Sequence, residues 1–126
     1  MSRGLPKRLV AAVLERDRGL CVLQISPDCL GAASVADHRA NRGHGGAKTG
    51  VLDRMSNLVA ACGICNGAKE DATGALRDSL VNRGLRISPG RTHAHTAEKV
   101  LVLPVYYPDG EPWWLDDEGG RRGQPW

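Results

Sequence analysis

Residues 57–66 read NLVAACGICN, and this stretch decides how the chain folds. Its first part is short and apolar, which predicts a β-strand, and it runs directly into the Cys62-Gly63-Ile64-Cys65 knuckle. A Cys-x2-Cys pair at the point where a strand turns into a helix is typical of half a zinc site. The helix N-terminus favours negative charge and would help to keep both thiols ionised. We therefore expect a metal-stabilised turn here.

The other half of the site is expected from CVLQISPDC, residues 21–29, which carries Cys21 and Cys29, the remaining two of the four cysteines. Pro27 and Asp28 indicate a turn with one cysteine on each flank. In a reducing compartment, paired cysteines hold a metal more often than they form disulfides. A structural Zn2+ on all four cysteines is the prediction. Four buried thiols without a ligand are the alternative.

A long-tipped β-hairpin is expected around the Asp37-His38 pair. AASVADH, residues 32–38, is short and apolar and predicts a strand that pairs with the later strand NLVAAC. The connection, residues 39–56, is a loop by composition because it is rich in glycine and basic residues. Asp37 and His38 thus fall at the end of the first strand. Taken alone, the pair favours the plainer interpretation of an exposed turn residue and a hydrogen-bonded structural histidine.

The motif order resembles the HNH endonucleases. It reads Cys…Cys…Asp-His…Asn-Leu…Cys-x2-Cys-Asn-x2-Lys and covers about residues 20–70. These are metal-dependent nucleases with a ββα-metal core that four cysteines and a zinc ion often stabilise. The resemblance implies an α+β fold and hydrolysis of DNA phosphodiester bonds that leaves a 5′ phosphate and a 3′ hydroxyl. The chain is also similar to small free-standing bacteriophage HNH nucleases, some of which work beside terminase subunits in the host cytoplasm.

The resemblance also implies roles for single residues. His38 would be the general base that takes a proton from the attacking water, and it would have to be neutral to do so. Asp37 and Asn66 would hold one Mg2+ or Mn2+ through a carboxylate and an amide oxygen. Asn57 would tie the long loop back to the hairpin and so orient His38. For Asn66, simple capping of the following helix is the alternative.

Basic residues around these motifs suggest contact with phosphate groups. Residues 1–70 hold ten Lys/Arg against six Asp/Glu, a balance of +4, whereas residues 71–126 hold seven against eight, a balance of −1. A positive surface suits a nucleic acid, and an ordinary solvated surface is the alternative. The predicted contacts are Lys69, Arg39, Arg42 and Arg54.

At 126 residues, the chain is expected to form one domain with four parts. These are an N-terminal helix in residues 1–19, the zinc-stapled core in 20–70, a helix in 71–86, and a small hairpin and tail in 87–126. The chain lacks a run of 18 apolar residues and the apolar segment of a signal peptide. We therefore expect a soluble, cytoplasmic protein that does not associate with membranes.

Two further expectations concern the C-terminal part and the competing function. His93 and His95 are expected on one face of a strand, at the surface. The competing function is a zinc-dependent nucleic-acid or protein-binding module that keeps the scaffold without the reaction. Neither function fixes the oligomeric state.

Overall fold

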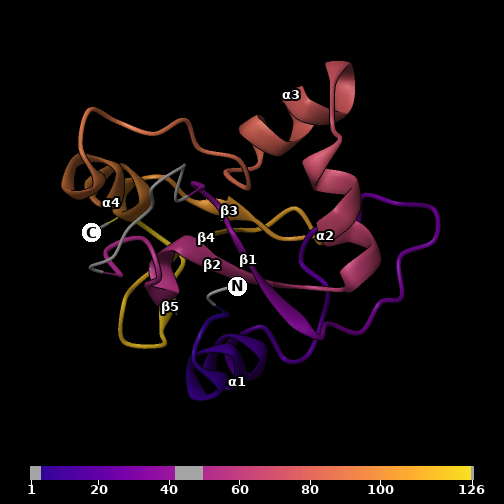
Figure 1. Ribbon diagram of the computed structural model, residues 1–126, viewed down its shortest axis with the longest axis horizontal. Helices are drawn as coiled ribbons and strands as arrows, with labels where there is room; N and C mark the ends of the chain where they lie inside the picture. Colours follow the sequence, from indigo (N-terminus) through magenta and orange to yellow (C-terminus); the bar gives the residue numbers. More distant parts are fainter. Residues whose placement is uncertain (1–3, 42–49, 126) are drawn as a thin grey trace.

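The predicted hairpin is present in the computed structural model, which describes residues 4–41 and 50–125 (Figure 1). Strands β1 (Val35–His38) and β2 (Leu58–Ala61) pair antiparallel, with His38 opposite Leu58 and Asp37 opposite Val59. All four residues of β2 are buried, because the sheet is covered on both faces. A short 3-10 helix, η1 (Met55–Asn57), leads into β2. Asp37 and His38 therefore stand where the chain leaves β1.

Helix α2 (Gly63–Glu70) starts directly after β2, as the knuckle predicts. The Cys62 thiol caps it by accepting a hydrogen bond from the backbone N–H of Cys65, at 3.3 Å. In Figure 1, α2 and the following α3 (Gly74–Asn82) lie to the right of the hairpin and above it. Residues 71–73 separate the two helices, and α3 begins at Gly74.

Gly84 ends the α3 segment for a steric reason. Its φ of +71° lies in the left-handed region, and its backbone N–H donates to the carbonyl of Val81 at 3.0 Å. A Cβ at this position would meet the carbonyl oxygen of Pro104 at 2.0 Å. Only glycine therefore lets the segment that follows α4 approach the end of α3 so closely.

Helix α1 (Lys7–Arg16) confirms the predicted N-terminal helix. In Figure 1 it lies below the hairpin, on the side away from α3. Together with β2, it encloses an apolar core made largely of aliphatic side chains, as a chain without Phe requires. Among its members are Val13, Leu58, Val59, Leu80 and Leu115. Helices around small antiparallel sheets make the fold α+β.

The region after residue 86 differs from the predicted hairpin and tail. It contains a helix, α4 (His93–Val102), followed by three short strands, β3 (Val105–Tyr106), β4 (Pro112–Leu115) and β5 (Arg121–Arg122). The strands form an antiparallel sheet in the order β3-β4-β5. The expected hairpin is therefore formed by β3 and β4, and β5 adds a third strand.

The prediction that His93 and His95 lie on a strand is wrong. Both belong to the first turn of α4, where the Thr92 side chain accepts a hydrogen bond from the His95 N–H at 3.0 Å. Thr96, Ala97 and Val100 are buried, a spacing that fits one helical face. The continuous apolar run of residues 100–103 at the end of this segment also fits a strand, which obscures that periodicity in the sequence.

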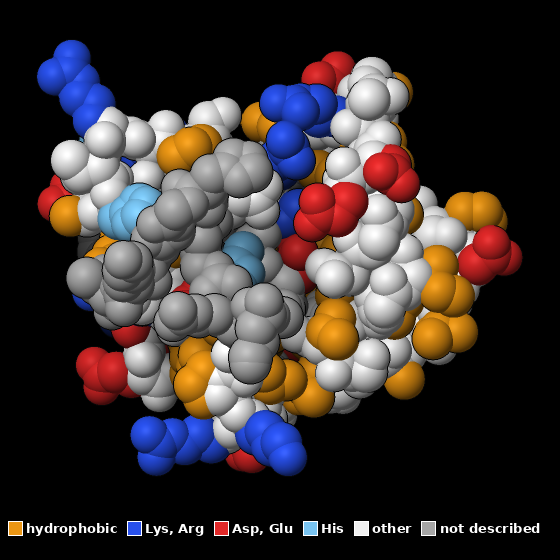
Figure 2. Space-filling view, viewed as in Figure 1, with side chains coloured by type: hydrophobic (Ala, Val, Ile, Leu, Met, Phe, Trp, Pro, Cys, Tyr) orange, Lys and Arg blue, Asp and Glu red, His pale blue; other side chains and the backbone are white. Residues whose placement is uncertain are grey.

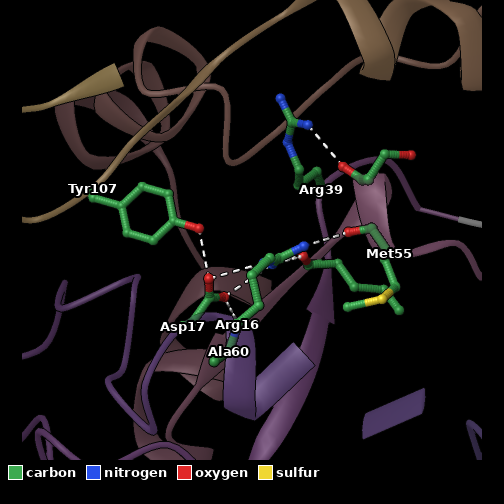
Figure 3. Close-up of polar contacts among 8 residues, drawn as sticks. Arg16, Asp17, Arg39, Met55, Ala60 and Tyr107 are labelled. Carbon is green, nitrogen blue, oxygen red and sulfur yellow. Dashed lines mark hydrogen bonds and ion pairs between the residues drawn. The ribbon is translucent and has the colours of Figure 1, made fainter. Parts of the chain in front are cut away.

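A buried polar network fixes α1 to the rest of the fold (Figure 3). The carboxylate of Asp17 accepts hydrogen bonds from the backbone N–H of Ala60 at 2.9 Å and from the hydroxyl of Tyr107 at 2.6 Å. Arg16 donates to the same carboxylate at 3.0 and 2.9 Å, and it reaches the carbonyl oxygen of Met55 at 2.8 Å. The network thus joins α1 to β2, η1 and the segment after β3.

Replacing Asp17 by alanine is expected to lower the free energy of unfolding by about 3–5 kcal/mol, because the buried Arg16 guanidinium would then have no opposite charge beside it. The Arg16 side chain is only 2% exposed and would lose its partner. The measurement is urea unfolding of Asp17→Ala beside Asp78→Ala, which removes an exposed carboxylate from α3. Equal losses of stability in the two variants would contradict the role assigned to the network.

No helix in the described ranges 4–41 and 50–125 is long and apolar enough to cross a bilayer.

Candidate functional site

The four cysteines come together in one cluster, as predicted. Their Sγ atoms all lie within 4.8 Å of one another, and none of the four forms a disulfide. The Cys62 and Cys29 Sγ atoms are 3.9 Å apart. Tetrahedral zinc with bonds of about 2.3 Å separates its sulfur ligands by about 3.8 Å, so the donor set and its size fit zinc. The cluster could hold one zinc ion.

The wide spacing of the first pair is accommodated by a closed loop. The backbone N–H of Cys21 donates to the carbonyl of Gly31 at 2.9 Å, and Leu20 forms an isolated antiparallel bridge with Ala32. These contacts hold the two ends of the segment 21–31 next to each other. As a result Cys29 returns to Cys21 despite the seven residues between them.

The electrostatics of the cluster favour a thiolate on Cys62. Burial by itself raises the pKa of this thiol, whereas hydrogen bonds from the backbone N–H groups of Leu30 and Cys65 lower it. With hydrogen bonds from the Cys65 and Cys21 thiols, they bring the pKa of Cys62 down to about 6. Since thiolates, not thiols, bind zinc, the fold prepares this ligand for metal.

Asp37 and Lys69 form a buried ion pair at the end of β1. The Lys69 Nζ atom, on α2, lies 2.6 Å from Asp37 Oδ2 and 2.6 Å from the carbonyl oxygen of His38. The Asp37 side chain is 9% exposed and the Lys69 side chain is 7% exposed. Burial raises the pKa of Asp37, which the Lys69 charge opposes, and burial lowers the pKa of Lys69, which the Asp37 charge opposes. Lys69 therefore ties α2 to the strand end.

His38 has a carboxylate partner that the sequence does not identify. Its Nε2 atom lies 2.7 Å from Asp53 Oδ1, and the two side chains are 17% and 19% exposed. An imidazole that donates from Nε2 to a carboxylate keeps a lone pair on Nδ1, which can accept a proton. Asp53 lies within the region expected to be a loop, 15 residues after His38, and no spacing rule points to it.

Asn57 joins the two ends of the long loop. Its side-chain oxygen accepts from the backbone N–H of Ala40 at 2.8 Å, and its Nδ2 donates to the carbonyls of Ala40 and Leu52, each at 2.9 Å. Asn57 is 2% exposed, so these hydrogen bonds are shielded from water. The amide therefore fixes the chain immediately after His38 against the segment that carries Asp53.

Arg39 is not placed to bind nucleic acid, contrary to the prediction. It is 1% exposed, and all its side-chain nitrogens donate to backbone carbonyls. Its closest acceptors are Gly84 and Leu103, each at 2.7 Å. Burial lowers the pKa of Arg39 to about 9, with the charge of Arg16 adding to the effect. Arg39 holds the ends of α3 and α4 at the hairpin.

The other predicted basic contacts have different surroundings. Arg54 is exposed, and its Nη1 atom lies 3.6 Å from Asp117 Oδ2 at the surface. Lys69 is committed to the ion pair with Asp37. Arg42 lies outside the described residues. Of the four predicted contacts, only Arg54 is therefore seen as an exposed side chain in the part of the chain that the structure describes.

Asn66 lies one residue after Cys65, in the first half of α2. Its backbone N–H donates to the carbonyl of Cys62 at 3.0 Å, and its side chain is half-buried. The side chain makes no hydrogen bond with residues 4–41 or 50–125, and it is not the cap of α2, which is Cys62. Its amide oxygen is therefore available as a ligand.

The Asp37 carboxylate at the strand end already has a cationic partner. The Lys69 ammonium lies 2.6 Å from Asp37 Oδ2. A divalent ion on that oxygen would replace the ammonium. Carboxylate and amide oxygens of Asp37 and Asn66 are the ligand types that Mg2+ and Mn2+ take.

Comparison with known proteins gives no relative: no protein-family model, no curated protein and no solved structure matches this chain.

Proposed function

We propose that this chain is a metal-dependent HNH endonuclease that hydrolyses DNA phosphodiester bonds. The observation that carries the proposal is the His38–Asp53 contact at the end of β1, next to Asp37 and braced by α2. A histidine on a hairpin, followed by a helix that contributes further polar ligands, is the arrangement that the HNH resemblance implies. The four-cysteine cluster at the start of α2 supports the same proposal.

His38 acts as the general base in this proposal. Asp53 holds the ring through Nε2, which leaves Nδ1 to accept the proton of the attacking water. Because both side chains are largely buried, the hydrogen bond is protected from competition with solvent. Asn57 fixes the backbone on both sides of this pair, so the ring keeps one orientation.

Asp37 and Asn66 would hold the catalytic Mg2+ or Mn2+. When bound, such an ion offsets negative charge on the phosphoryl and departing oxygens. In this proposal Asp37 would contribute its carboxylate from β1, and Asn66 would contribute its amide oxygen from α2. The chain thus supplies ligands from both elements that Lys69 already joins.

The zinc cluster would position one of these ligands. Asn66 directly follows Cys65, and the thiols of Cys62 and Cys65 belong to the first turn of the same helix. A zinc ion that clamps this turn to Cys21 and Cys29 therefore also fixes Asn66. In this proposal the metal cluster and the catalytic site form one mechanical unit.

A second candidate function is a binding module on the same scaffold that has no activity. The Asp37–Lys69 ion pair favours it, because the ammonium occupies the carboxylate oxygen that a catalytic cation would need. The two functions both predict bound zinc and binding of DNA. They differ in whether a divalent cation displaces Lys69 and supports cleavage.

Incubation of the zinc-loaded protein with supercoiled plasmid and Mg2+ or Mn2+ tests the proposed function. We expect nicked circles that DNA ligase reseals, because ligase joins only a 5′ phosphate to a 3′ hydroxyl. The control is the same reaction with Ca2+ in place of the other two ions. Nicks that ligase leaves open would refute the proposed chemistry, and an intact plasmid with both metals would favour the binding module.

A further inference from the structure

A small basic cavity lies beside the strand end that carries Asp37 and His38. Its volume is about 110 Å3. No acidic side chain is among the described residues that line it, whereas the basic ones are Lys69, Arg77, Arg86 and Arg39. Figure 2 shows Lys and Arg side chains gathered over α3 and reaching into the hollow beside that helix.

The basic side chains divide into two that are committed and two that are not. Arg39 uses its nitrogens on backbone carbonyls, and Lys69 uses its ammonium on Asp37 and His38. Arg77 and Arg86 have no hydrogen-bond or ion-pair partner for their guanidinium groups within residues 4–41 and 50–125. The charge of Arg86 is nevertheless close enough to Lys69 to lower the pKa of the ammonium.

Uncompensated positive charge of this kind favours an anion. Two guanidinium groups from different segments, one on α3 and one in the loop after it, present planar donor sets to a single small space. The volume is well below the ~300 Å3 at which small-molecule pockets begin, and it suits a group such as one phosphate. Lys69 lines part of this cavity and also donates a hydrogen bond to the His38 carbonyl at the strand end.

We propose that Arg77 and Arg86 bind a backbone phosphate of the DNA strand that His38 attacks. This inference rests on the proposed function and adds a named anchoring subsite to it. The bound phosphate is one that flanks the scissile bond, because the cavity adjoins the strand end through Lys69 without containing His38. The two arginines fix the position of the strand and do not read its sequence.

The test is equilibrium binding of a fluorescently labelled DNA duplex to the zinc-loaded protein in a His38→Ala background, where the duplex stays intact. Adding Arg77→Gln and Arg86→Gln together is expected to weaken binding on the order of tenfold or more. The slope of log affinity against log salt concentration should fall by about 0.9, the amount lost with one phosphate contact to B-form DNA.

Two control variants distinguish a specific phosphate subsite from a general effect of positive charge on DNA binding. Lys7→Gln with Arg8→Gln removes the same charge from exposed positions on α1, at the opposite side of the molecule from α3 in Figure 1, and should change affinity much less. Arg77→Lys with Arg86→Lys keeps the charge and should restore most of the salt slope, with part of the affinity. Zinc content and melting temperature are checked for every variant.

Equal weakening in the α1 variant and in the Arg77/Arg86 variant would overturn the inference. Unchanged duplex binding in the Arg77/Arg86 variant would also overturn it, and calorimetric binding of inorganic phosphate that this variant alone loses would then identify a free anion as the ligand. Because no cleavage is measured, the result is independent of the plasmid assay. If the wild-type protein fails to nick DNA but the Arg77/Arg86 variant shows the predicted fall in salt slope, the phosphate subsite stands and only the proposed nuclease activity is refuted.

Discussion

Replacing Cys62 and Cys65 by serine is expected to abolish zinc binding and to remove the cooperative unfolding transition. A structural zinc site contributes apparent binding energies of about 10–16 kcal/mol in small zinc-finger peptides, which matches or exceeds the ~5–15 kcal/mol that stabilise a whole domain. Here the two residues begin α2 and also face Cys21 and Cys29, so their loss frees two segments at once. Thermal unfolding followed by circular dichroism, with zinc measured by atomic emission, checks the result.

Chelation offers a control that leaves the sequence unchanged. Wild-type protein treated with a strong chelator should lose the same transition and regain it when zinc is returned. The serine variant should respond to neither step. Unchanged melting after the metal is removed, or four thiols that react equally fast with and without zinc, would contradict a structural metal at this cluster.

His38→Ala is expected to slow DNA cleavage about 10²- to 10⁴-fold, the usual contribution of a positioned general base. The substitution removes the proton acceptor together with its 2.7 Å contact to Asp53 Oδ1. The measurement is the single-turnover cleavage rate of a labelled duplex with Mg2+ or Mn2+ in excess. The matched control is His95→Ala, because His95 is an exposed histidine on α4 and is assigned no role in the reaction.

Asp53→Asn provides a graded version of the same experiment. An amide at this position can still contact Nε2 but no longer enforces the tautomer with Nδ1 free, so a loss of about 10- to 100-fold is expected. Binding of the duplex should not change. A rate equal to that of the wild type would show that Asp53 does not orient His38.

Much of the fold could be predicted from the sequence because the deciding signals are local. The hairpin strands, the start of α2 at the Cys62–Cys65 knuckle and the N-terminal helix α1 each follow from residues within a few positions of one another. The four-cysteine cluster was also predictable, since the Cys62–Cys65 spacing fixes the ligand type, and Cys21 and Cys29 are the only other thiols.

The missed features depend on contacts between distant segments. Arg39 resembles any basic loop residue until α4, more than 60 positions later, supplies the carbonyls of Val100 and Leu103. Asp53 acquires its significance only when the loop folds back on His38. Lys69 similarly changes from an expected phosphate contact to the partner of Asp37, 32 residues away. Burial and pairing of single charges are set by tertiary structure, which local patterns do not encode.

The most direct test of the account is the rate at which the zinc-loaded protein converts supercoiled plasmid to nicked circles, measured for wild type and His38→Ala purified in parallel. The account predicts nicking by the wild type that requires Mg2+ or Mn2+, with His38→Ala slower by at least about a hundredfold and equal to wild type in zinc content. A wild-type protein that is inert with both metals, or a His38→Ala protein that cuts equally fast, would contradict it.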